Sequence, residues 1–467
     1  MAPVQFGTDG WRAVIADEFT FENVRGIAQA WSDYLIEDSS AHHGVAVAYD
    51  TRFMSGQFAR AFAEVVASNK ISVFLSHTVM PTPVLSFIVK AKQLDGGAMI
   101  TASHNPYYYN GIKFKAAYGG PVMSEVTEQI AAKMNQNKPR IDRALIRQYL
   151  VEENFFTAYQ RHMQNYLKFD VLGQGSFPII YDPMHGAGTG LLKRLLVGTS
   201  RRIKSVHSKS DPLFNGKHPE PIPENLTDLI RMVKKQPGTL GIATDGDADR
   251  FGVIAEDGQF AQLHDLMPLL FQYLLESRGW PGQVVRTTSM ADTIDKMAQK
   301  YKRRVIEVPV GFKHVTEVML REDILIGGEE SGGFGFRNHL PERDGLLSSL
   351  LLLEMLAAYR CSLRDLIRQL RKDYGPFAYG RIDHYDDYGR LQKNLSDLRG
   401  ASPEQLAGYK IKRISLIDGI KFYLENGAWM LIRVSQTEPL ARIYVGADEK
   451  EPVNQLLQAG VELITKK

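Results

Sequence analysis

The feature that most constrains the fold is an order of segments that the chain repeats three times. In the first pass, short apolar runs at residues 44–49, 71–75 and 98–100 are separated by segments with helical patterns. Such runs are typical of buried strands in a parallel sheet that helices cover on both faces. Ligands of such sheets lie at the carboxyl ends of the strands, and each third strand of this chain runs into a polar loop. The pattern therefore predicts an α/β protein with its functional residues in these loops.

The three polar loops differ in their chemistry. The loop at 101–106 presents a serine, the loop at 244–250 presents three aspartates, and the loop at 328–333 presents acidic and hydroxyl side chains among glycines. Strands are expected directly before the second and third loops, at 241–243 and 324–327. Sequence identity among the passes is weak, and their period is too long for a solenoid, so we interpret them as a structural repeat.

The last part of the chain follows a different pattern. A helix-rich stretch at 346–371 leads into a polar segment around 383–400 and then into strand patterns, with a hairpin turn signal at Asp418–Gly419 and a closing helix at 453–464. At about 150 residues per domain, a chain of this length holds three or four domains. We place three structurally similar α/β domains with mixed sheets and one C-terminal α+β domain at 1–150, 151–260, 261–375 and 376–467.

Charge and hydropathy argue against several classes of protein. The 56 Lys and Arg residues against 53 Asp and Glu leave a net charge of +3, too balanced for nucleic acid or an anionic membrane as the main partner. Residues 1–10 lack the basic region and apolar core of a signal peptide. The longest apolar run, 346–359, is interrupted by polar residues and is too short to span a bilayer. We expect a cytoplasmic protein without an intramolecular disulfide bond, because Cys361 is its only cysteine.

Ser103 lies in a turn directly after an expected strand. A serine hydroxyl is a weak nucleophile, so chemistry at Ser103 requires a base, a metal ion or an already transferred phosphate. The alternative is a Ser-Asn-Pro turn with no chemical role. Nearby, Lys113 is a candidate acid/base or phosphate-binding group and His104 a candidate proton shuttle. Alternatively, Lys113 is an ordinary solvated lysine and His104 hydrogen-bonds the backbone of the turn.

Asp245, Asp247 and Asp249 are spaced two residues apart, and Gly246 permits a curl that brings them together. Three adjacent carboxylates repel one another unless a hard cation lies between them, and ligation by oxygen alone favours Mg²⁺. The alternative is a solvated acidic turn before a hairpin at 251–259. We favour the metal site, because three aspartates in five residues are flanked by apolar strands and followed by Arg250.

Two further groups of residues are typical of a sugar phosphate site. Glu329 and Ser331 could hydrogen-bond vicinal sugar hydroxyls, or could form an ordinary acidic helix start. The loop at 433–442 collects two guanidiniums, two hydroxyls and exposed amides, as a phosphate site requires. Lys313 and His314 are candidates for substrate contacts or for solvated residues.

Taken in this order, the four loops resemble those of the α-D-phosphohexomutase superfamily. The Gly-rich opening at 6–12 and the loop at 182–188 fit the same family, so the resemblance covers nearly the whole chain. It implies four domains around a central cleft, a phosphoserine at Ser103, and Mg²⁺ held by Ser103 and the three aspartates. It also implies a hexose phosphate substrate contacted by Arg250, Lys313, His314, Glu329, Ser331, Arg433, Ser435, Gln436, Thr437 and Arg442.

The resemblance also implies a reaction. A phosphorylated Ser103 would donate its phosphoryl group to a hexose 1- or 6-phosphate. The resulting glucose 1,6-bisphosphate would turn over in the cleft and return its other phosphate to Ser103. Arg12, Lys113 and Mg²⁺ would offset the charge of the group in transfer. We expect a monomer or homodimer that interconverts glucose 1-phosphate and glucose 6-phosphate, with activity on mannose phosphates left open.

Other activities fit the same residues. They are those of a phosphomannomutase, a phosphoglucosamine mutase, a phosphoserine-dependent sugar phosphatase and a catalytically silent sugar-phosphate binding protein. The Thr101 opening and the Glu-Glu-Ser-Gly-Gly form of the sugar loop look closer to phosphoglucomutases and phosphomannomutases than to phosphoglucosamine mutases. The segment at 339–345 also looks like a phosphoglucomutase feature. A second phosphate site argues against a phosphatase, because hydrolysis does not need one.

Two residues depart from the pattern of the family. Gly333 takes the place of a histidine that some members carry, which leaves Lys113, His104 and His314 as candidates for the general acid/base. Gln436 takes a place that Gly or Asn usually holds, which bears on the backbone of the phosphate loop.

Overall fold

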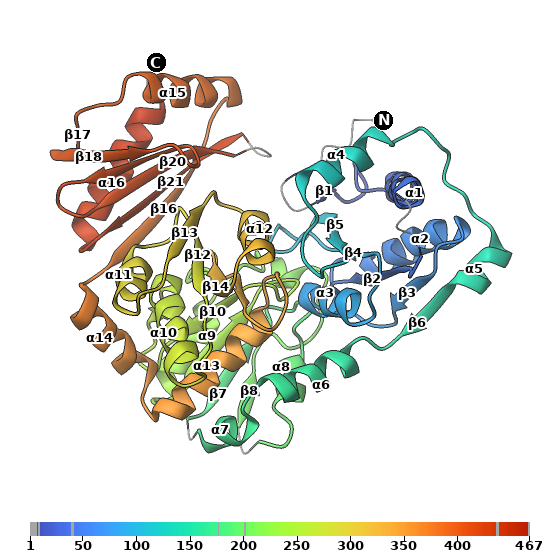
Figure 1. Cartoon of the computed structure of the whole chain (residues 1–467), viewed down its shortest axis with the longest axis horizontal. Coiled ribbons are helices and arrows are strands. Elements are labelled where there is room, and N and C mark those ends of the chain that lie inside the picture. Colours follow the sequence, from blue (N-terminus) through green and yellow to red (C-terminus); the bar gives the residue numbers. More distant parts are fainter. Residues whose placement is uncertain are drawn as a thin grey trace.

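The computed structural model describes residues 7, 10–38, 42–175, 177–199, 202–435 and 439–465. These residues form three α/β domains and a C-terminal α+β domain, which follow one another along the chain (Figure 1). The predicted fold class is therefore confirmed.

The first domain has a six-stranded mixed sheet in the order β1-β5-β4-β2-β3-β6. Strand β2 is parallel to β3 and β4, whereas β5 is antiparallel to β4. The strands are β1 (Trp11–Val14), β2 (Val45–Tyr49), β3 (Val73–Ser76), β4 (Gly96–Ile100), β5 (Tyr109–Ala116) and β6 (Leu150–Glu153). The helices are α1 (Phe21–Glu37), α2 (Ser55–Ser68), α3 (Thr82–Ala91), α4 (Ser124–Ala132) and α5 (Arg143–Tyr149).

The second and third domains have sheets in the orders β11-β10-β9-β7-β8 and β13-β12-β14-β15. The second contains α6 (Phe156–Tyr166), α7 (Phe169–Gln174), β7 (Ile179–Asp182), α8 (Leu191–Leu195), β8 (Ile203–Ser205), η1 (Phe214–Gly216), α9 (Thr227–Lys235), β9 (Leu240–Thr244), β10 (Phe251–Ile254) and β11 (Phe260–Ala261). The third contains α10 (Leu263–Glu276), β12 (Gln283–Thr287), α11 (Thr293–Lys300), β13 (Val305–Val308), α12 (Phe312–Arg321), β14 (Ile324–Gly328), β15 (Phe334–Phe336), α13 (Gly345–Tyr359) and α14 (Leu363–Tyr374).

One arrangement of four strands recurs in the three α/β domains. Its order is β5-β4-β2-β3 in the first domain, β10-β9-β7-β8 in the second and β15-β14-β12-β13 in the third. Each time, one central strand is parallel to its neighbour on one side and antiparallel to the next strand along the chain. The serine, aspartate and Glu329 loops each connect such an antiparallel pair. The predicted structural repeat therefore places three chemically different loops at equivalent points.

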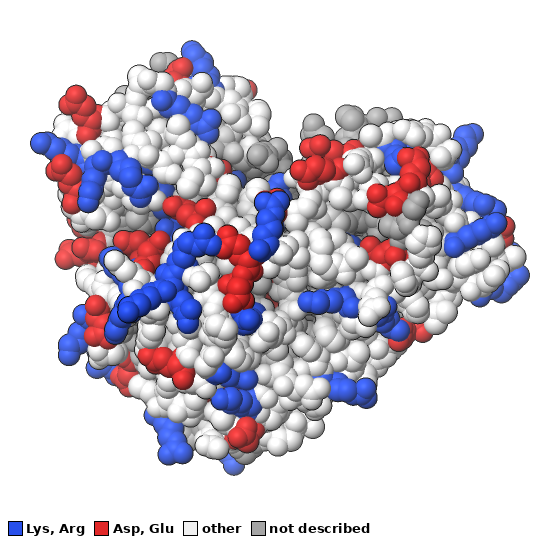
Figure 2. Space-filling view, in the orientation of Figure 1, with Lys and Arg blue, Asp and Glu red and all other residues white. Residues whose placement is uncertain are grey.

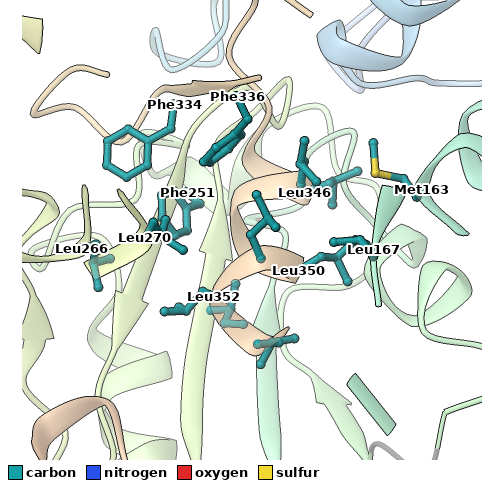
Figure 3. Packing of buried hydrophobic residues seen from close by; sticks show 14 of the residues in the cluster. Met163, Leu167, Phe251, Leu266, Leu270, Phe334, Phe336, Leu346, Leu350 and Leu352 are labelled. Atoms are coloured by element: carbon teal, nitrogen blue, oxygen red, sulfur yellow. The ribbon is translucent and has the colours of Figure 1, made fainter. Parts of the chain in front are cut away.

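The core of the second and third domains surrounds α13. Nearly every side of this helix is apolar, and its residues from Gly345 to Ala357 are all buried. Figure 3 shows Leu346 and Leu350 between Met163 on one side and Phe251 on the other. Among the described residues, no single helix is long and apolar enough to cross a membrane, although α13 and α14, which meet at 83°, pass that test as a bent pair.

The fourth domain has the sheet order β16-β21-β20-β19-β18-β17. Its elements are β16 (Ala378–Tyr385), α15 (Tyr388–Gly400), β17 (Gln405–Leu406), β18 (Tyr409–Ser415), β19 (Ile420–Leu424), β20 (Trp429–Val434), β21 (Leu440–Ala447) and α16 (Lys450–Thr465). The polar segment around 383–400 proves to hold the end of β16 and all of α15. This helix buries only Leu391, Asn394, Leu395 and Leu398, so its sequence is dominated by its solvated face.

A hollow lies between the fourth domain, at the upper left of Figure 2, and the first domain, at the upper right. Both acidic and basic side chains border it. Lys115 on β5 forms an ion pair with Glu342 of the third domain, and both side chains are completely buried. This pair ties the first domain to the loop that precedes α13.

Replacing one partner of this pair should be costly, because the remaining charge stays buried without compensation. We expect Lys115→Met to lower the free energy of unfolding by about 3–5 kcal/mol. Lys115→Met combined with Glu342→Leu should recover most of that loss. Urea-induced unfolding followed by circular dichroism measures both effects. Lys133→Ala, which removes the pair with the exposed Glu37, serves as the control and should change stability by less than about 1 kcal/mol.

Candidate active site

Ser103 is held in a strained, buried turn after β4. Its φ is +52°, in the left-handed region that residues other than glycine seldom adopt. The hydroxyl of Thr101 accepts a hydrogen bond from Ser103 N at 2.9 Å. The Ser103 hydroxyl in turn donates to Asp245 Oδ2 at 3.0 Å. The first and second domains therefore meet at the Ser103 hydroxyl.

Arg52 shapes the backbone of this turn. Its guanidinium is buried and donates hydrogen bonds of 2.6–2.9 Å to the carbonyl oxygens of Ser103, Asn105, Pro106 and Tyr109. Asp50 lies 3.2 Å from Arg52 Nε and also accepts a hydrogen bond from Thr101 Oγ1 at 2.6 Å. Arg52 was not among the residues predicted from the sequence, although its position just after the expected strand at 44–49 was a signal.

The three aspartates follow β9 in a curled turn. One ligand atom of each lies within 4.8 Å of those of the other two, and all three side chains are buried. Ala248 adopts a φ of +56°, which contributes to the curl. A Cβ atom at Gly246 would lie 2.5 Å from Ser103 O, so only glycine lets the two loops approach this closely.

The loop at 182–188 packs against the aspartate turn and hydrogen-bonds to its backbone. Ala187 N donates to Gly246 O at 2.9 Å. A Cβ atom at Gly186 would lie 2.6 Å from the same oxygen. No separate role for this loop was predicted from the sequence, and its contacts show that it supports the aspartate turn.

Cations from two other domains compensate part of the triad's charge. Lys113 Nζ lies 2.8 Å from Asp247 Oδ2 and 3.1 Å from Asp249 Oδ2. Arg343, from the third domain, lies 2.9 Å from Asp249 Oδ2. Burial and the neighbouring Asp247 and Asp249 carboxylates raise the pKa of Asp245.

The triad also offers oxygen atoms for a metal ion. Asp247 Oδ1 and Asp249 Oδ1 are buried and accept no hydrogen bond from the described residues. Burial opposes ionisation of Asp247, but Lys113 and a hydrogen bond from Thr82 at 2.6 Å outweigh it and lower the pKa of Asp247. An ionised carboxylate with an unused buried oxygen is a suitable ligand for a hard divalent cation. The residues present therefore fit the predicted Mg²⁺.

Several positive charges act on His104, the residue that follows Ser103 in the chain. Burial and, after it, Arg250, Arg12, Arg442 and Lys113 hold the pKa of His104 well below its ordinary value. These four cations come from the first, second and fourth domains. Arg12 also donates to Asn105 Oδ1 at 2.5 Å. The positive charges of the predicted Arg12, Lys113, Arg250 and Arg442 therefore all act on the imidazole of His104, and an anionic group near it would be stabilised.

Glu329 lies at the end of β14, beside Arg343. Glu329 Oε2 is 3.7 Å from Arg343 Nη1, and its Oε1 accepts a hydrogen bond from Gly311 N at 3.1 Å. Burial raises the pKa of Glu329 to about 7, against the opposing charge of Arg343. A Cβ atom at Gly333 would lie 2.3 Å from Arg343 Cδ. Arg343 therefore fills the space beside Gly333.

Arg343 is the second residue that the sequence analysis missed. It bridges the aspartate turn and Glu329, which come from different domains. Arg343 lies within the segment at 339–345, which could have drawn attention to it. In the sequence that segment served only to choose among subfamilies.

The fourth domain places two of its predicted phosphate ligands side by side. Arg433 on β20 lies opposite Arg442 on β21 in the sheet register. Ser435 is buried and donates its backbone N–H to Leu440 O at 2.9 Å. Gln436 and Thr437 lie outside the described residues.

The three remaining candidates are Lys313, His314 and Ser331. Lys313 Nζ donates to Ser124 Oγ at 2.8 Å and so joins the third domain to the first. His314, next to it, is partly buried, and burial lowers its pKa. Ser331 is partly buried in the turn between β14 and β15.

Comparison with known protein families covers the four domains in turn. Models of the phosphoglucomutase/phosphomannomutase family match at residues 3–140 for α/β/α domain I, 157–258 for domain II, 263–374 for domain III and 390–463 for the C-terminal domain.

Relatives align over nearly the whole chain. A probable phosphoglucosamine mutase of Methanopyrus kandleri is 30% identical over 99% of this chain and 98% of its own. The phosphoglucomutase/phosphomannomutase of Thermococcus kodakarensis is 29% identical over 98% of each chain. The crystal structure of a Thermus thermophilus protein, provisionally named a phosphomannomutase, matches with a TM-score of 0.89 and 36% identity over 100% of both chains. The chain therefore belongs to the phosphoglucomutase/phosphomannomutase family of phosphohexomutases.

Proposed function

We propose that this enzyme interconverts glucose 1-phosphate and glucose 6-phosphate, with Ser103 carrying the phosphoryl group between turnovers. The observation that carries the proposal is the position of the Ser103 hydroxyl. It lies 3.0 Å from Asp245, beside a triad with two carboxylate oxygens to which no described residue donates. Cations from three domains surround the same point, as phosphoryl transfer requires.

The first half-reaction transfers the phosphoryl group from Ser103 to the sugar. A sugar hydroxyl attacks the phosphorus, the new bond joins phosphorus to the sugar oxygen, and the bond to Ser103 Oγ breaks. The proton of the attacking hydroxyl passes to a base, for which His104 and Lys113 are the nearest candidates. The product is glucose 1,6-bisphosphate. After the sugar has turned in the site, its other phosphate returns to Ser103 by the reverse of the same step.

The remaining site residues bind the parts of the substrate that do not react. Arg433 and Arg442, with Ser435, Gln436 and Thr437 in the connecting loop, would hold the distal phosphate. Glu329 and Ser331 would bind sugar hydroxyls. A distal phosphate site serves both orientations of the sugar, whereas hydrolysis has no use for it. This supports a mutase over a phosphatase.

Mg²⁺ is the cofactor that the triad fits. Asp245, Asp247 and Asp249, with an oxygen of phosphorylated Ser103, would hold it, and it would offset the negative charge of the group in transfer. Lys113 and Arg343 form ion pairs with the triad and so also offset part of its negative charge.

The form of the sugar loop favours glucose or mannose over glucosamine, and the segment at 339–345, which resembles that of phosphoglucomutases, favours glucose. Glu329 and Ser331 would contact hydroxyls that glucose and mannose share, so mannose phosphates are proposed as further substrates. Phosphoglucosamine mutase activity is the second candidate, supported by the name of the Methanopyrus kandleri relative with 30% identity.

A comparison of substrates tests this proposal. With Mg²⁺ and a trace of the matching 1,6-bisphosphate, we expect glucose 1-phosphate to be converted faster than mannose 1-phosphate, and both faster than glucosamine 1-phosphate. Coupled assays measure each rate. Fastest turnover of the glucosamine phosphate would favour the second candidate, and release of inorganic phosphate without isomerisation would contradict a mutase.

Removing the Ser103 hydroxyl should abolish turnover, because no other group would carry the phosphoryl group. We expect Ser103→Ala to lower kcat by at least about 10⁴-fold. Mass spectrometry of the wild-type protein treated with the bisphosphate should find the phosphate on Ser103. Ser362→Ala, which changes only the N-cap of α14, is the control. Unchanged turnover of Ser103→Ala would exclude the proposed mechanism.

The pKa of Glu329 makes substrate affinity depend on pH. Burial raises this pKa to about 7, so the carboxyl ionises as the pH rises through neutrality. The ionised form is the better acceptor for sugar hydroxyls, so KM should fall by up to about tenfold between about pH 6 and about pH 8. Glu329→Gln should retain only the change due to titration of the substrate phosphate. Identical KM profiles for the two proteins would show that Glu329 does not bind the sugar.

A further inference from the structure

A short segment of the third domain, residues 308–311, joins the end of β13 to α12 and carries contacts with the fourth domain. The side chain of Val310 packs against an apolar cluster on the fourth domain's sheet, formed by Trp429, Leu431 and Tyr444. The backbone N–H of Val310 donates to Asp418 Oδ2 at 3.0 Å. Both the side chain and the backbone of one residue therefore hold the fourth domain.

A second contact lies beside the first. Lys421, on β19, is buried and donates to Thr288 O at 2.5 Å. The backbone N–H of Thr288 donates to Val308 O at 2.9 Å, so this contact leads back to the same segment. The start of β19 is thus fastened to the third domain at two adjacent points.

Asp418 lies in the hairpin turn between β18 and β19, next to the strand of Arg433. The turn needs glycine at the following position, since Gly419 has a φ of +67° and its Cβ would lie 2.1 Å from Ile432 O. Asp418 Oδ2 is 2.9 Å from Arg433 Nε. Aspartate is common in such turns because its carboxylate bonds its own backbone. Here the carboxylate instead meets Val310 of another domain and the side chain of Arg433.

The same segment also holds the sugar loop. Gly311 N, the next donor after Val310 N, donates to Glu329 Oε1 at 3.1 Å. Two successive backbone N–H groups therefore bind two carboxylates, one from the fourth domain and one from the third. Residues 308–311 bind Glu329 directly and bind Arg433 through Asp418. The segment therefore fixes where the Arg433 guanidinium lies relative to Glu329.

We propose that Asp418 is a positioning residue, which sets the guanidinium of Arg433 for the distal phosphate of a hexose phosphate and registers it against the sugar loop through Val310 and Gly311. This inference rests on the proposed function, because it takes Arg433 as a phosphate ligand. Asp418 contacts Arg433 at Nε, the inner nitrogen of the guanidinium, and a carboxylate there restricts rotation of the planar group. Without it, the phosphate must order the arginine on binding, which costs affinity.

The test measures substrate affinity apart from turnover. We expect Asp418→Ala to raise KM for glucose 1-phosphate about tenfold and to change kcat by less than about twofold, because a group that helps binding equally in the ground and transition states affects KM alone. Inhibition by inorganic phosphate should weaken by a similar factor. Asp418→Asn, which keeps an oxygen for Val310 N–H but loses the charge, should raise KM by a smaller factor.

Two controls separate positioning from a general loss of structure. Glu425→Ala changes an exposed acidic residue in the hairpin between β19 and β20 and should leave KM unchanged. Asp418→Ala introduced into an Arg433→Met protein should raise KM no further, because the group that Asp418 positions is already gone. An additive effect of the two substitutions, or a fall in kcat at constant KM, would overturn the inference.

The outcome also distinguishes this inference from the proposed function. If the wild-type enzyme converts glucose phosphates while Asp418→Ala leaves KM and phosphate inhibition unchanged, the inference is wrong and the function stands. If the wild-type enzyme converts no hexose phosphate, the function is wrong. Calorimetric titration with inorganic phosphate then decides on Asp418, since binding must weaken with Asp418→Ala in the wild-type protein and not in Arg433→Met.

Discussion

Three carboxylates buried within reach of one another need compensating positive charge, and much of this structure depends on that requirement. Asp245, Asp247 and Asp249 are completely buried in the second domain. The compensating Lys113 belongs to the first domain and Arg343 to the third. Buried charges that lack such partners would cost several kcal/mol each. The charge of the triad is therefore compensated only when the α/β domains meet, and the unused oxygens of Asp247 and Asp249 remain available to a divalent cation.

The repeated topology explains how three domains can supply one site. In each α/β domain the functional loop joins a central strand to an antiparallel neighbour, so equivalent loops present different chemistry at equivalent points. Loops placed this way require support, since their backbones are irregular and buried. Arg52 provides that support for the serine turn, with hydrogen bonds to four carbonyl oxygens. The loop at 182–188 provides it for the aspartate turn.

The fourth domain reaches the site by a different route. Its sheet does not repeat the α/β arrangement, and its arginines are carried on the neighbouring strands β20 and β21. Residues 308–311 connect it with the third domain through hydrogen bonds and an apolar contact. Because the same segment binds Glu329, the distance between the Arg433 guanidinium and the Glu329 carboxylate depends on one stretch of backbone.

The sequence by itself determined the fold class, most helices and strands, and the clustered residues Ser103, Asp245, Asp247 and Asp249. Periodicity and loop composition are local, and the apolar runs at 44–49, 71–75 and 98–100 coincide closely with β2, β3 and β4. Helix α15 was missed because its buried face holds only four residues. Arg52, Arg343 and Asp418 were assigned by tertiary structure alone. Their partners lie far away in the chain, Arg52 being 51 residues from Ser103, and no local pattern encodes which distant carbonyl or carboxylate a buried guanidinium will meet.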